Sequence, residues 1–576
     1  MTTGISPAAR RRWLVQAPID GATSSALGEF PPVVRQLLAN RGIRSTAAAD
    51  LYLSADDRLA GDPSDIPDMA IAAERVQKAL GSGELIGIYG DYDADGVTAC
   101  ALLVEALRAL GSDPVTFIPH RIQDGYGIGE RGLRYLADQG VTAVISVDCG
   151  ISGVNGGAKV PAGMDLIVTD HHVAPAHLPD VFAAVDPVRV DSSYPSPELA
   201  GVGVAFKLIQ ALYEMNGREW DQSLLEYVAI GTVADVAPLV GENRFLVRSG
   251  LDRLHHSVRP GIQALARSAR RDISRLDEEA IGFGLGPRIN AAGRMAHADL
   301  GLRLLLSRDD DDAMLLAAEL EGLNTQRQRL TQEVVERARM TVLERDAIDP
   351  VILIGGEDFP AGIVGLAAGR IAEEFNRPTI VYEERDGHVR ASARSVPGFD
   401  VTSALATCSD LLSGHGGHHQ AAGFSALVEN IDELRERLIA IAGELLSQEE
   451  LEPSIRIDVE AAPSTLPGEV MVLLKRMAPF GAQNAPPVYV GRGLDVRSLR
   501  TMGAGNEHLR MTLREPDHRV TWDAVAWRQG DRASDPLGGR FDIAYKLQTG
   551  GSNTGFSRGA LELEVLDFQP SSPVEA

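Results

Sequence analysis

A repeated order of short apolar strand, turn and helix begins at Leu85 and most constrains the fold of this chain. The apolar runs are LIGIYG at 85–90, VTFIP at 115–119, AVISV at 143–147, DLIVT at 165–169 and FAAV at 182–185. A helical segment, VTACALLVEALRAL, follows the first run. Buried strands that alternate with helices are typical of a doubly wound parallel sheet. The pattern therefore predicts an α/β domain, which we place at residues 76–309.

Acidic residues stand directly after three of these strands. Asp91 follows the first strand, Asp148 follows AVISV and Asp170 follows DLIVT. The carboxyl ends of parallel strands meet at one edge of the sheet, and ligands of open α/β sheets bind at that edge. We therefore expect these side chains to gather around one ligand site.

The rest of the 576 residues predicts further domains, because a domain usually spans ~100–200 residues. Helical periodicity runs from about residue 201 to 346 and ends in a predicted connecting helix at 310–346. A second, smaller α/β pattern occupies 347–450, and short alternating strands indicate a small β-barrel at 451–576. Residues 1–75 are predicted to form an N-terminal extension that packs on the α/β domain.

Charge and cysteine content narrow the class of protein. The net charge of −25 argues against a broad basic surface that coats nucleic acid, so any nucleic-acid site must be local. Cys100, Cys149 and Cys408 form no CxxC pair, which fits a reducing cytoplasm. No run of ~18 apolar residues occurs, and we expect neither export nor a membrane span.

The segment GDYDADG places Asp91, Asp93 and Asp95 at alternate positions before Gly96. In an extended segment this alternation puts the carboxylates on one side, and clustered carboxylates are costly unless a cation neutralises them. An EF-hand calcium loop begins in a similar way but needs Glu at its twelfth position, where this chain has Leu102. Taken alone, the segment is also compatible with a surface turn.

Further acids and imidazoles favour a metal site over a turn. They are Asp148 in VDCG, Asp170, His171 and His172 in TDHH, and Asp235 in GTVADVAPL. Carboxylates with one or two imidazoles suit Mn²⁺ or Mg²⁺, whereas zinc usually recruits more His or Cys. Two such ions ~3.5–4 Å apart bind a phosphate oxygen, activate a water and stabilise the leaving oxygen. The set therefore predicts phosphodiester hydrolysis with two ions.

The motifs GDYDADG, VDCG, TDHH and VADVAPL, in this order, resemble those of the DHH phosphoesterases. GPRINAAGRM, ASARSVPGFD, GGHHQAAG and MAPFGAQNAPP are similar to the RecJ-type exonucleases of that family, so the resemblance covers nearly the whole chain. It implies a DHH domain, a DHHA1-like domain at 347–450 and an OB-fold at 451–576. It also implies 5′ to 3′ exonuclease activity on single-stranded DNA, in DNA repair and recombination.

The resemblance assigns metal ligation to Asp91, Asp93, Asp95, Asp148, His171 and Asp235. Asp148 is the expected bridge between the ions, and direct ligation is less secure for Asp91. His172 is expected to face the substrate phosphate. Its alternative role is a hydrogen bond that orients His171. Many DHH enzymes have a His at the place of Tyr89, and its absence here leaves one ion with fewer ligands.

Substrate contacts are also implied by the resemblance. Arg121, Ser392 and Arg394 are assigned to a pocket for the 5′-terminal phosphate. Arg288, Asn290 and Arg294 of GPRINAAGRM are placed beside the catalytic site, and His418 of GGHHQAAG is assigned as a donor to the substrate. From the residues alone, Arg121 is equally compatible with a surface ion pair, and GGHHQAAG with a tight turn onto a strand.

The segment between the third and fourth apolar runs departs from the family pattern. ISGVNGGAKVPAGM, between Asp148 and Asp170, is rich in Gly and Pro where the family usually has a helix. We therefore expect a poorly formed crossover between these two strands.

Two other functions stay open at this point. A DHH phosphodiesterase of short RNAs or cyclic dinucleotides shares the acids but needs neither the barrel nor the long connecting helix. A non-catalytic replication scaffold does not need all of the acids. We expect single-stranded DNA with a 5′ end as the partner of a cytoplasmic monomer. The resemblance adds a single-strand-binding protein and a RecQ-type helicase as protein partners.

Overall fold

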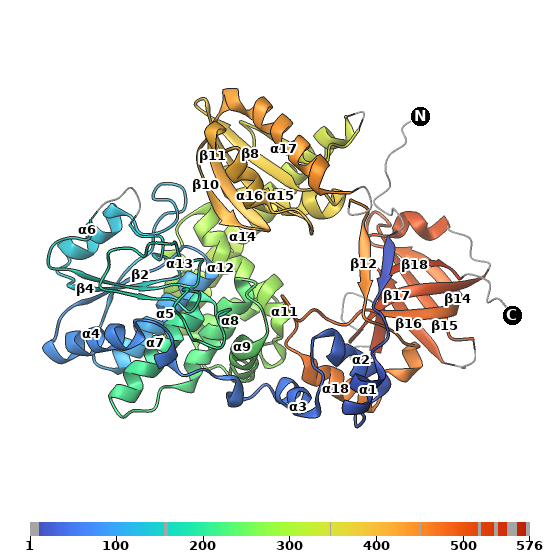
Figure 1. The fold of residues 1–576 in the computed structure, drawn as a ribbon, viewed down its shortest axis with the longest axis horizontal. Coiled ribbons are helices and arrows are strands. Elements are labelled where there is room, and N and C mark those ends of the chain that lie inside the picture. Colours follow the sequence, from blue (N-terminus) through green and yellow to red (C-terminus); the bar gives the residue numbers. More distant parts are fainter. Residues whose placement is uncertain are drawn as a thin grey trace. The chain divides into compact units, whose positions relative to one another are not determined.

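The computed structural model describes residues 11–154, 159–345, 347–447, 451–516, 520–534, 539–549 and 561–571 (Figure 1). The chain divides into two compact units. The first unit comprises Ala55–Leu330 and Pro479–Ala485. The second unit comprises the N-terminal residues to Ser54, Thr331–Ala478 and Pro486–Ala576.

A five-stranded parallel sheet forms the centre of the first unit, in the order β3-β2-β4-β5-β6. Its strands are β2 (Ile86–Tyr89), β3 (Val115–Phe117), β4 (Ala143–Val147), β5 (Asp165–Thr169) and β6 (Ala183–Val185). Alternate strand residues bury in two cores. Ile88 and Ile145 pack with α4 (Met69–Ser82), α5 (Ala94–Ala109) and α7 (Gly201–Met215), whereas Val144 and Leu166 pack with α6 (Glu130–Asp138). Helices on both faces confirm the predicted doubly wound sheet.

The connection between β4 and β5 contains no helix in the parts that the structure describes, 148–154 and 159–164. These residues form turns and one isolated bridge between Ile128 and Val154. The glycines and prolines of this segment explain the difference from a regular crossover helix, because both residue types disfavour helix interiors. Residues 155–158, also part of the predicted poorly formed crossover, lie outside the described residues.

Helices follow the sheet, as the periodicity predicts. They are α8 (Leu225–Ala234), α9 (Gly241–Leu254), α10 (Pro260–Ser268), α11 (Glu278–Ala280), the π-helical turn η6 (Ile281–Leu285), α12 (Gly286–Met295) and α13 (Asp299–Leu306). The long helix α14 (Asp310–Leu343) begins at the predicted residue and ends three positions before the predicted 346. None of the described helices is both long and apolar enough to cross a membrane.

The second unit contains a five-stranded sheet in the order β10-β11-β9-β8-β7. Its strands are β7 (Ile352–Gly356), β8 (Thr379–Arg385), β9 (His388–Arg394), β10 (Leu412–His418) and β11 (Ala421–Leu427). The helices of this region are α15 (Ala361–Phe375), α16 (Val401–Thr407) and α17 (Ile431–Leu445). β10 and β11 form a hairpin, so GGHHQAAG does include a turn onto a strand.

The C-terminal strands close into a barrel. They are β14 (Tyr489–Met502), β15 (His508–Arg514), β16 (Thr521–Ala526), β17 (Arg540–Thr549) and β18 (Leu561–Pro570). They pair in the order β14-β15-β16-β18-β17, and β17 pairs back to β14. The short strand β13 (Val459–Glu460) adds to β14, and helix α18 (Glu469–Met477) precedes the barrel. This closure confirms the predicted OB-fold.

The N-terminal residues differ from the expectation that 1–75 packs on the α/β domain. β1 (Arg12–Val15) pairs in parallel with β12 (Ser454–Ile457), and the Trp13 indole donates to Asp567 Oδ2 at 2.8 Å. Helices α1 (Gly21–Ala26), α2 (Pro32–Asn40) and α3 (Thr46–Ser54) belong to the same second unit. Only residues from Ala55 belong to the α/β unit. The sequence did not indicate this division, because the pairing of β1 with β12 joins segments more than 400 residues apart and leaves no local signal.

Candidate metal centre and anion pocket

The acidic loop of GDYDADG connects β2 to α5. Asp93 caps α5, and its Oδ1 accepts hydrogen bonds from the backbone N–H groups of Asp95 at 2.9 Å and Gly96 at 3.2 Å. Asp95 already lies in the first helical turn, which corrects the expectation of a fully extended segment. Capping prevails over extension because an Asp side chain satisfies the open N–H groups at a helix start.

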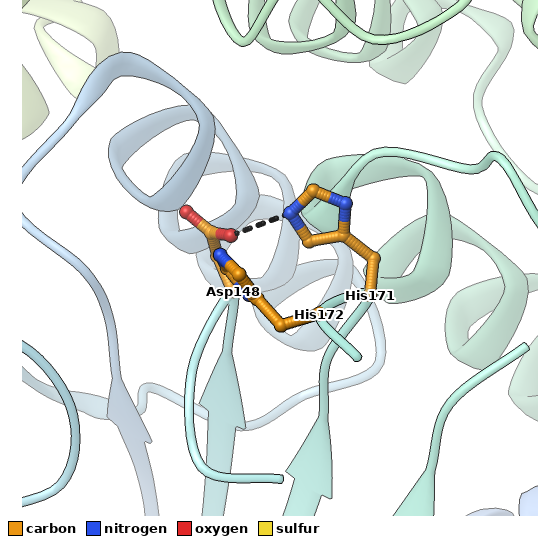
Figure 2. Close-up of side chains that lie close together, drawn as sticks. All are labelled: Asp148, His171 and His172. Atoms are coloured by element: carbon orange, nitrogen blue, oxygen red, sulfur yellow. Dashed lines mark hydrogen bonds and ion pairs between the residues drawn. The ribbon is translucent and has the colours of Figure 1, made fainter. Parts of the chain in front are cut away.

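All of the predicted ligand residues lie together in the first unit. One group of candidate ligand atoms comes from Asp91, Asp93 and Asp148, and a second comes from Asp95, His171 and Asp235, with the atoms of each group within 4.8 Å of one another. His171 Nε2 lies 3.1 Å from Asp148 Oδ1 (Figure 2). The same nitrogen lies 3.9 Å from Asp95 Oδ2. Asp148 therefore belongs to the first group and contacts His171 of the second group. A carboxylate that bridges two ions would occupy such a position.

Helix α7 holds Asp95 in place. Asp95 Oδ2 accepts from the Gly201 N–H at 2.7 Å, and Oδ1 accepts from the Val202 N–H at 2.9 Å. These N–H groups belong to the first turn of α7, and the N-terminus of a helix favours a negative charge. The carboxylate is thus fixed before any cation binds.

Two glycines on helices make room for the carboxylates. A Cβ on Gly201 would lie 2.7 Å from the Asp148 Cβ, and one on Gly231 would lie 2.3 Å from Thr98 Oγ1 and 2.8 Å from Asp95 Oδ1. Sequence reasoning missed both residues. In the sequence, Gly201 and Gly231 appear only as small residues within the apolar helical segments AGVGVAF and AIGTVAD. A small residue in a helix does not by itself indicate a ligand site.

Burial and mutual repulsion disfavour the charged forms of these acids. Burial raises the pKa of Asp95 to about 7, with a further contribution from the charge of Asp93. Burial also raises the pKa values of Asp91, Asp148 and Asp235 above their ordinary range, and neighbouring carboxylates add to each shift. A compact buried group of this kind needs protons or a cation to be stable.

The buried Oδ1 of Asp91 makes no hydrogen bond to the described residues. An oxygen of this kind, within a group of carboxylates and one imidazole, fits a hard divalent cation such as Mn²⁺ or Mg²⁺. The donor set, rich in oxygen and free of thiolates, does not resemble a structural zinc site.

His172 stands beside this centre and is held by Asp170. The Asp170 Oδ1 lies 2.7 Å from His172 Nδ1 and accepts from the His171 N–H at 2.8 Å. Burial alone would lower the pKa of His172, but the hydrogen bond and charge of Asp170, with the charges of Asp91 and Asp93, raise it above its ordinary value. This imidazole is therefore suited to carry a proton next to a phosphate.

Tyr126 is a contact of this histidine that sequence reasoning missed. Its hydroxyl lies 3.0 Å from His172 Nδ1 and donates to the Asp148 carbonyl oxygen at 3.2 Å. The residue lies in the loop DGYGIG, where Gly125 and Gly127 have φ values of 79° and 90°. A tyrosine between two glycines was the available signal.

Tyr89, at the position where the resemblance to DHH enzymes implies a His, has a structural role. Its buried hydroxyl accepts from the Gly129 N–H at 3.0 Å and donates to the Gly127 carbonyl oxygen at 3.3 Å. The side chain thereby fixes the end of the loop that carries Tyr126.

The predicted substrate residues of the first unit differ in their surroundings. The Arg121 guanidinium lies 4.0 Å from the Tyr92 ring centroid and forms no ion pair with any described residue, which disfavours a surface ion pair. Asn290 Oδ1 accepts from the Ala94 N–H at 2.9 Å, so this side chain supports the metal loop.

Arg288 and Arg294 belong to the same helix, α12, as Asn290. Arg288 donates to the carbonyl oxygens of Gly284 at 2.8 Å and Ser268 at 3.2 Å, and its Nε lies 2.6 Å from Glu321 Oε2. The structure thus directs this guanidinium to protein groups. Burial raises the pKa of Tyr92 in the metal loop. The positive charge of Arg294 partly opposes that shift, so it acts on this loop.

The other three predicted substrate residues lie on one face of the sheet in the second unit. Arg394 pairs with Ala421, which in turn pairs with His418, so these three side chains project from the same side. Ser392 pairs with Gly423 one row away. His418 is exposed, and Arg394 is partly buried.

Arg394 has the surroundings of an anion-binding residue. It donates to Ser392 Oγ at 3.2 Å and to the Ala393 carbonyl oxygen at 2.8 Å, and no carboxylate of the described residues pairs with it. Burial lowers its pKa, and no carboxylate of the described residues compensates its charge. Gly365 near the start of α15 leaves space here, since a Cβ would lie 2.9 Å from Ser392 Oγ. Sequence reasoning did not identify this glycine.

Family models match three parts of the chain. The N-terminal domain of the DHH family matches residues 85–232, the DHHA1 domain matches 348–444, and the RecJ OB domain matches 457–558.

Whole proteins and solved structures give the same result. Curated single-stranded-DNA-specific exonucleases RecJ from Dickeya dadantii and Escherichia coli are 35% and 34% identical, covering 90% and 91% of this chain and 93% and 94% of their own. The crystal structure of RecJ in complex with Mn²⁺ from Thermus thermophilus superposes with a TM-score of 0.80 at 29% identity, covering 98% of this chain and 80% of that one. The corresponding Mg²⁺ complex gives a TM-score of 0.76. The chain therefore belongs to the RecJ family of single-stranded-DNA-specific exonucleases, within the DHH phosphoesterases.

Proposed function

We propose that this protein is a metal-dependent exonuclease that hydrolyses single-stranded DNA from the 5′ end. The observation that carries the proposal is the pair of ligand groups that meet at Asp148. Asp91, Asp93 and Asp148 would hold one ion, and Asp95, Asp148, His171 and Asp235 the other. Mn²⁺ or Mg²⁺ at these positions supplies Lewis acidity and a nucleophilic water at neutral pH.

The chain's own residues orient and neutralise the scissile phosphate. Asp170 keeps the ring of His172 in place, and the raised pKa of His172 lets it hold a proton beside the phosphate, where a positive imidazolium stabilises developing charge. Arg121, stacked on Tyr92, adds a second cation near the acidic loop. Asn290 preserves the geometry of that loop through Ala94.

The polarity of digestion depends on Arg394 and Ser392 of the second unit, which would form the anion pocket. A terminal phosphate carries more negative charge than an internal diester, and the buried guanidinium of Arg394 with the Ser392 hydroxyl is suited to bind it. Binding the 5′-phosphate there would select 5′ ends. The OB barrel supplies a surface for a longer strand, which a phosphodiesterase of dinucleotides does not need.

Two further features are part of the proposal. The protein acts in DNA repair and recombination in the cytoplasm as a monomer. Its protein partners are a single-strand-binding protein and a RecQ-type helicase.

A single strand labelled at both ends, with a 5′-phosphate or a 5′-hydroxyl, tests this proposal. We expect the 5′ label to be released first and the phosphorylated strand to be preferred. Arg394→Ala should lose most of that preference, since charge-assisted contacts contribute about 1.5–3 kcal/mol, and should retain metal binding. Arg385→Ala, at an exposed end of β8, is the matched control and should behave as wild type. Release of the 3′ label first would refute the polarity.

A further inference from the structure

An aromatic side chain is exposed on the first unit close to the metal centre. Phe283 is 78% exposed and lies in the π-helical turn η6, between Gly282 and Gly284. Scattered exposed apolar residues are normal in proteins, but a fully presented ring on a π-helical turn is less common, and such turns are frequent at functional sites.

Arginines flank this ring although the chain as a whole is acidic. Arg270 and Arg271 are exposed just beyond the end of α10, and neither side chain pairs with a described residue. Arg271 packs against η6, because a Cβ on Gly284 would lie 3.7 Å from the Arg271 Cγ. Arg271 therefore lies against the turn that carries the ring, and Arg270 is the exposed residue before it.

Among the described residues, no nearby acid forms an ion pair with either arginine. Asp272 lies 3.9 Å from Arg275, Asp277 Oδ1 accepts from the Ala280 N–H at 2.8 Å, and Glu278 Oε1 accepts from the Phe480 N–H at 2.6 Å. In a chain of net charge −25, two exposed arginines outside any ion pair of the described residues are available to contact backbone phosphates.

This surface is rigidly connected to the metal centre. Arg288 joins η6 and α10 to α12 through the carbonyl oxygens of Gly284 and Ser268. A Cβ on Gly286 would lie 2.9 Å from the Cβ of Ala234, the residue before Asp235. Further along α12, a Cβ on Gly293 would lie 2.3 Å from the Tyr92 carbonyl oxygen of the acidic loop. Helix α12 thus leads from Phe283 to the acids over about 10–15 Å, at roughly 1.5 Å per residue.

We propose that Phe283, Arg270 and Arg271 form a second contact surface for the single strand, away from the reacting phosphate. The ring stacks on a base, and the guanidinium groups contact backbone phosphates. Base stacking on aromatic residues accepts any base, and arginine contacts follow the backbone, so the surface holds single strands without sequence preference. A paired duplex does not offer its base faces to the ring. This inference rests on the proposed nuclease function and extends it to substrate length.

Binding without cleavage tests the surface most directly. The affinity of a fluorescent oligonucleotide is measured by anisotropy in EDTA over a range of salt concentrations. We expect Phe283→Leu to bind about tenfold more weakly, whereas Phe283→Trp keeps the stack and binds as wild type. The double variant Arg270→Gln/Arg271→Gln should reduce the magnitude of the salt slope by about 1.4, at about 0.7 for each phosphate contact on a single strand.

A matched double variant controls for charge alone. Arg303 and Arg308 are exposed and lie near the C-terminal end of α5, whereas the acids lie at its N-terminal end. Arg303→Gln/Arg308→Gln should leave the salt slope unchanged. Melting temperatures show whether each variant is folded, and the arginine pair tests the surface independently of Phe283.

Cleavage separates this inference from the function on which it rests. With Mn²⁺, the Phe283 and arginine variants should lose efficiency on long strands and retain wild-type turnover of a dinucleotide. Wild-type affinity and wild-type cleavage of long strands in both sets of variants would overturn the surface but leave the nuclease intact. Failure of the unaltered protein to digest any single strand would instead overturn the proposed function.

Discussion

The side chain of Asn290 accepts a hydrogen bond from the backbone N–H of Ala94, at 2.9 Å, and so joins α12 to the acidic loop between Asp93 and Asp95. The resemblance places Asn290 among the substrate contacts, whereas this bond gives it a positioning role. Asn290→Ala leaves the buried N–H of Ala94 without its partner, at a cost of about 1–3 kcal/mol. We expect weaker Mn²⁺ binding by calorimetry, with metal saturation restoring most activity. Unchanged metal affinity with a raised KM would favour a substrate contact.

Gly231 is predicted to be essential for the carboxylate cluster. Gly231→Ala would place a methyl group 2.3 Å from Thr98 Oγ1 and 2.8 Å from Asp95 Oδ1. We expect a loss of about 1–3 kcal/mol in stability from overpacking, together with weaker metal binding. Gly81→Ala is the control, because no heavy atom lies within 4 Å of its added Cβ in helix α4. That variant should gain about 0.5–1 kcal/mol, and thermal melts of both distinguish the cases.

Metal binding should stabilise the protein more strongly at higher pH. The pKa of Asp95 rises from its ordinary 3.8 to about 7 on folding, so its protonated form favours the folded state. That contribution is complete below about pH 4 and is lost as the pH rises through about 7. A divalent cation replaces protons among the acids, so the rise in Tm on adding Mn²⁺ should be larger at pH 8 than at pH 6. An equal or larger rise at pH 6 would contradict this assignment.

An experiment that deletes the C-terminal barrel must take the pairing of β1 with β12 into account. Removing residues 451–576 should weaken binding of long single strands and leave cleavage of very short oligonucleotides largely unchanged. The same deletion also removes β12 and Asp567, the partners of β1 and Trp13. A variant that lacks both 1–54 and 451–576 should therefore be less prone to aggregation than one that lacks 451–576 alone, as measured by light scattering. Equal loss of activity on short and long substrates would contradict a binding role for the barrel.

The sequence was sufficient to predict the parallel sheet and most residues of the carboxylate cluster. Strands of the parallel sheet are continuous apolar runs, and an acid directly after three of these runs marks the ligand edge, so Asp91 and Asp148 could be placed without a structure. Asp235 stood out as a charge within an otherwise apolar segment. The assignment of each acid to one ion came from the resemblance and stays a prediction.

Other contacts depend on distant residues and had no local signal. The pairing of β1 with β12, the bond from Ala94 to Asn290 and the fit of Gly231 against Asp95 each join segments more than a hundred residues apart. Tyr126 was not identified because a tyrosine in a glycine-rich loop is more often structural. The sequence motif also does not reveal that Gly284, Ser268 and Glu321 surround the guanidinium of Arg288, and its substrate role stays a prediction.

The central claim is that the acids around Asp148 hold the ions that hydrolyse single-stranded DNA. The direct measurement is the digestion of an end-labelled single strand by wild type and by Asp148→Ala, with Mn²⁺ or with EDTA, and with the paired duplex as a second substrate. We predict Mn²⁺-dependent release of nucleotides from the single strand by wild type only, little digestion of the duplex, and a melting temperature for Asp148→Ala that is unchanged or higher, because removing one carboxylate relieves repulsion. Substantial digestion by folded Asp148→Ala at saturating Mn²⁺, or equal digestion by wild type in EDTA, would contradict the account.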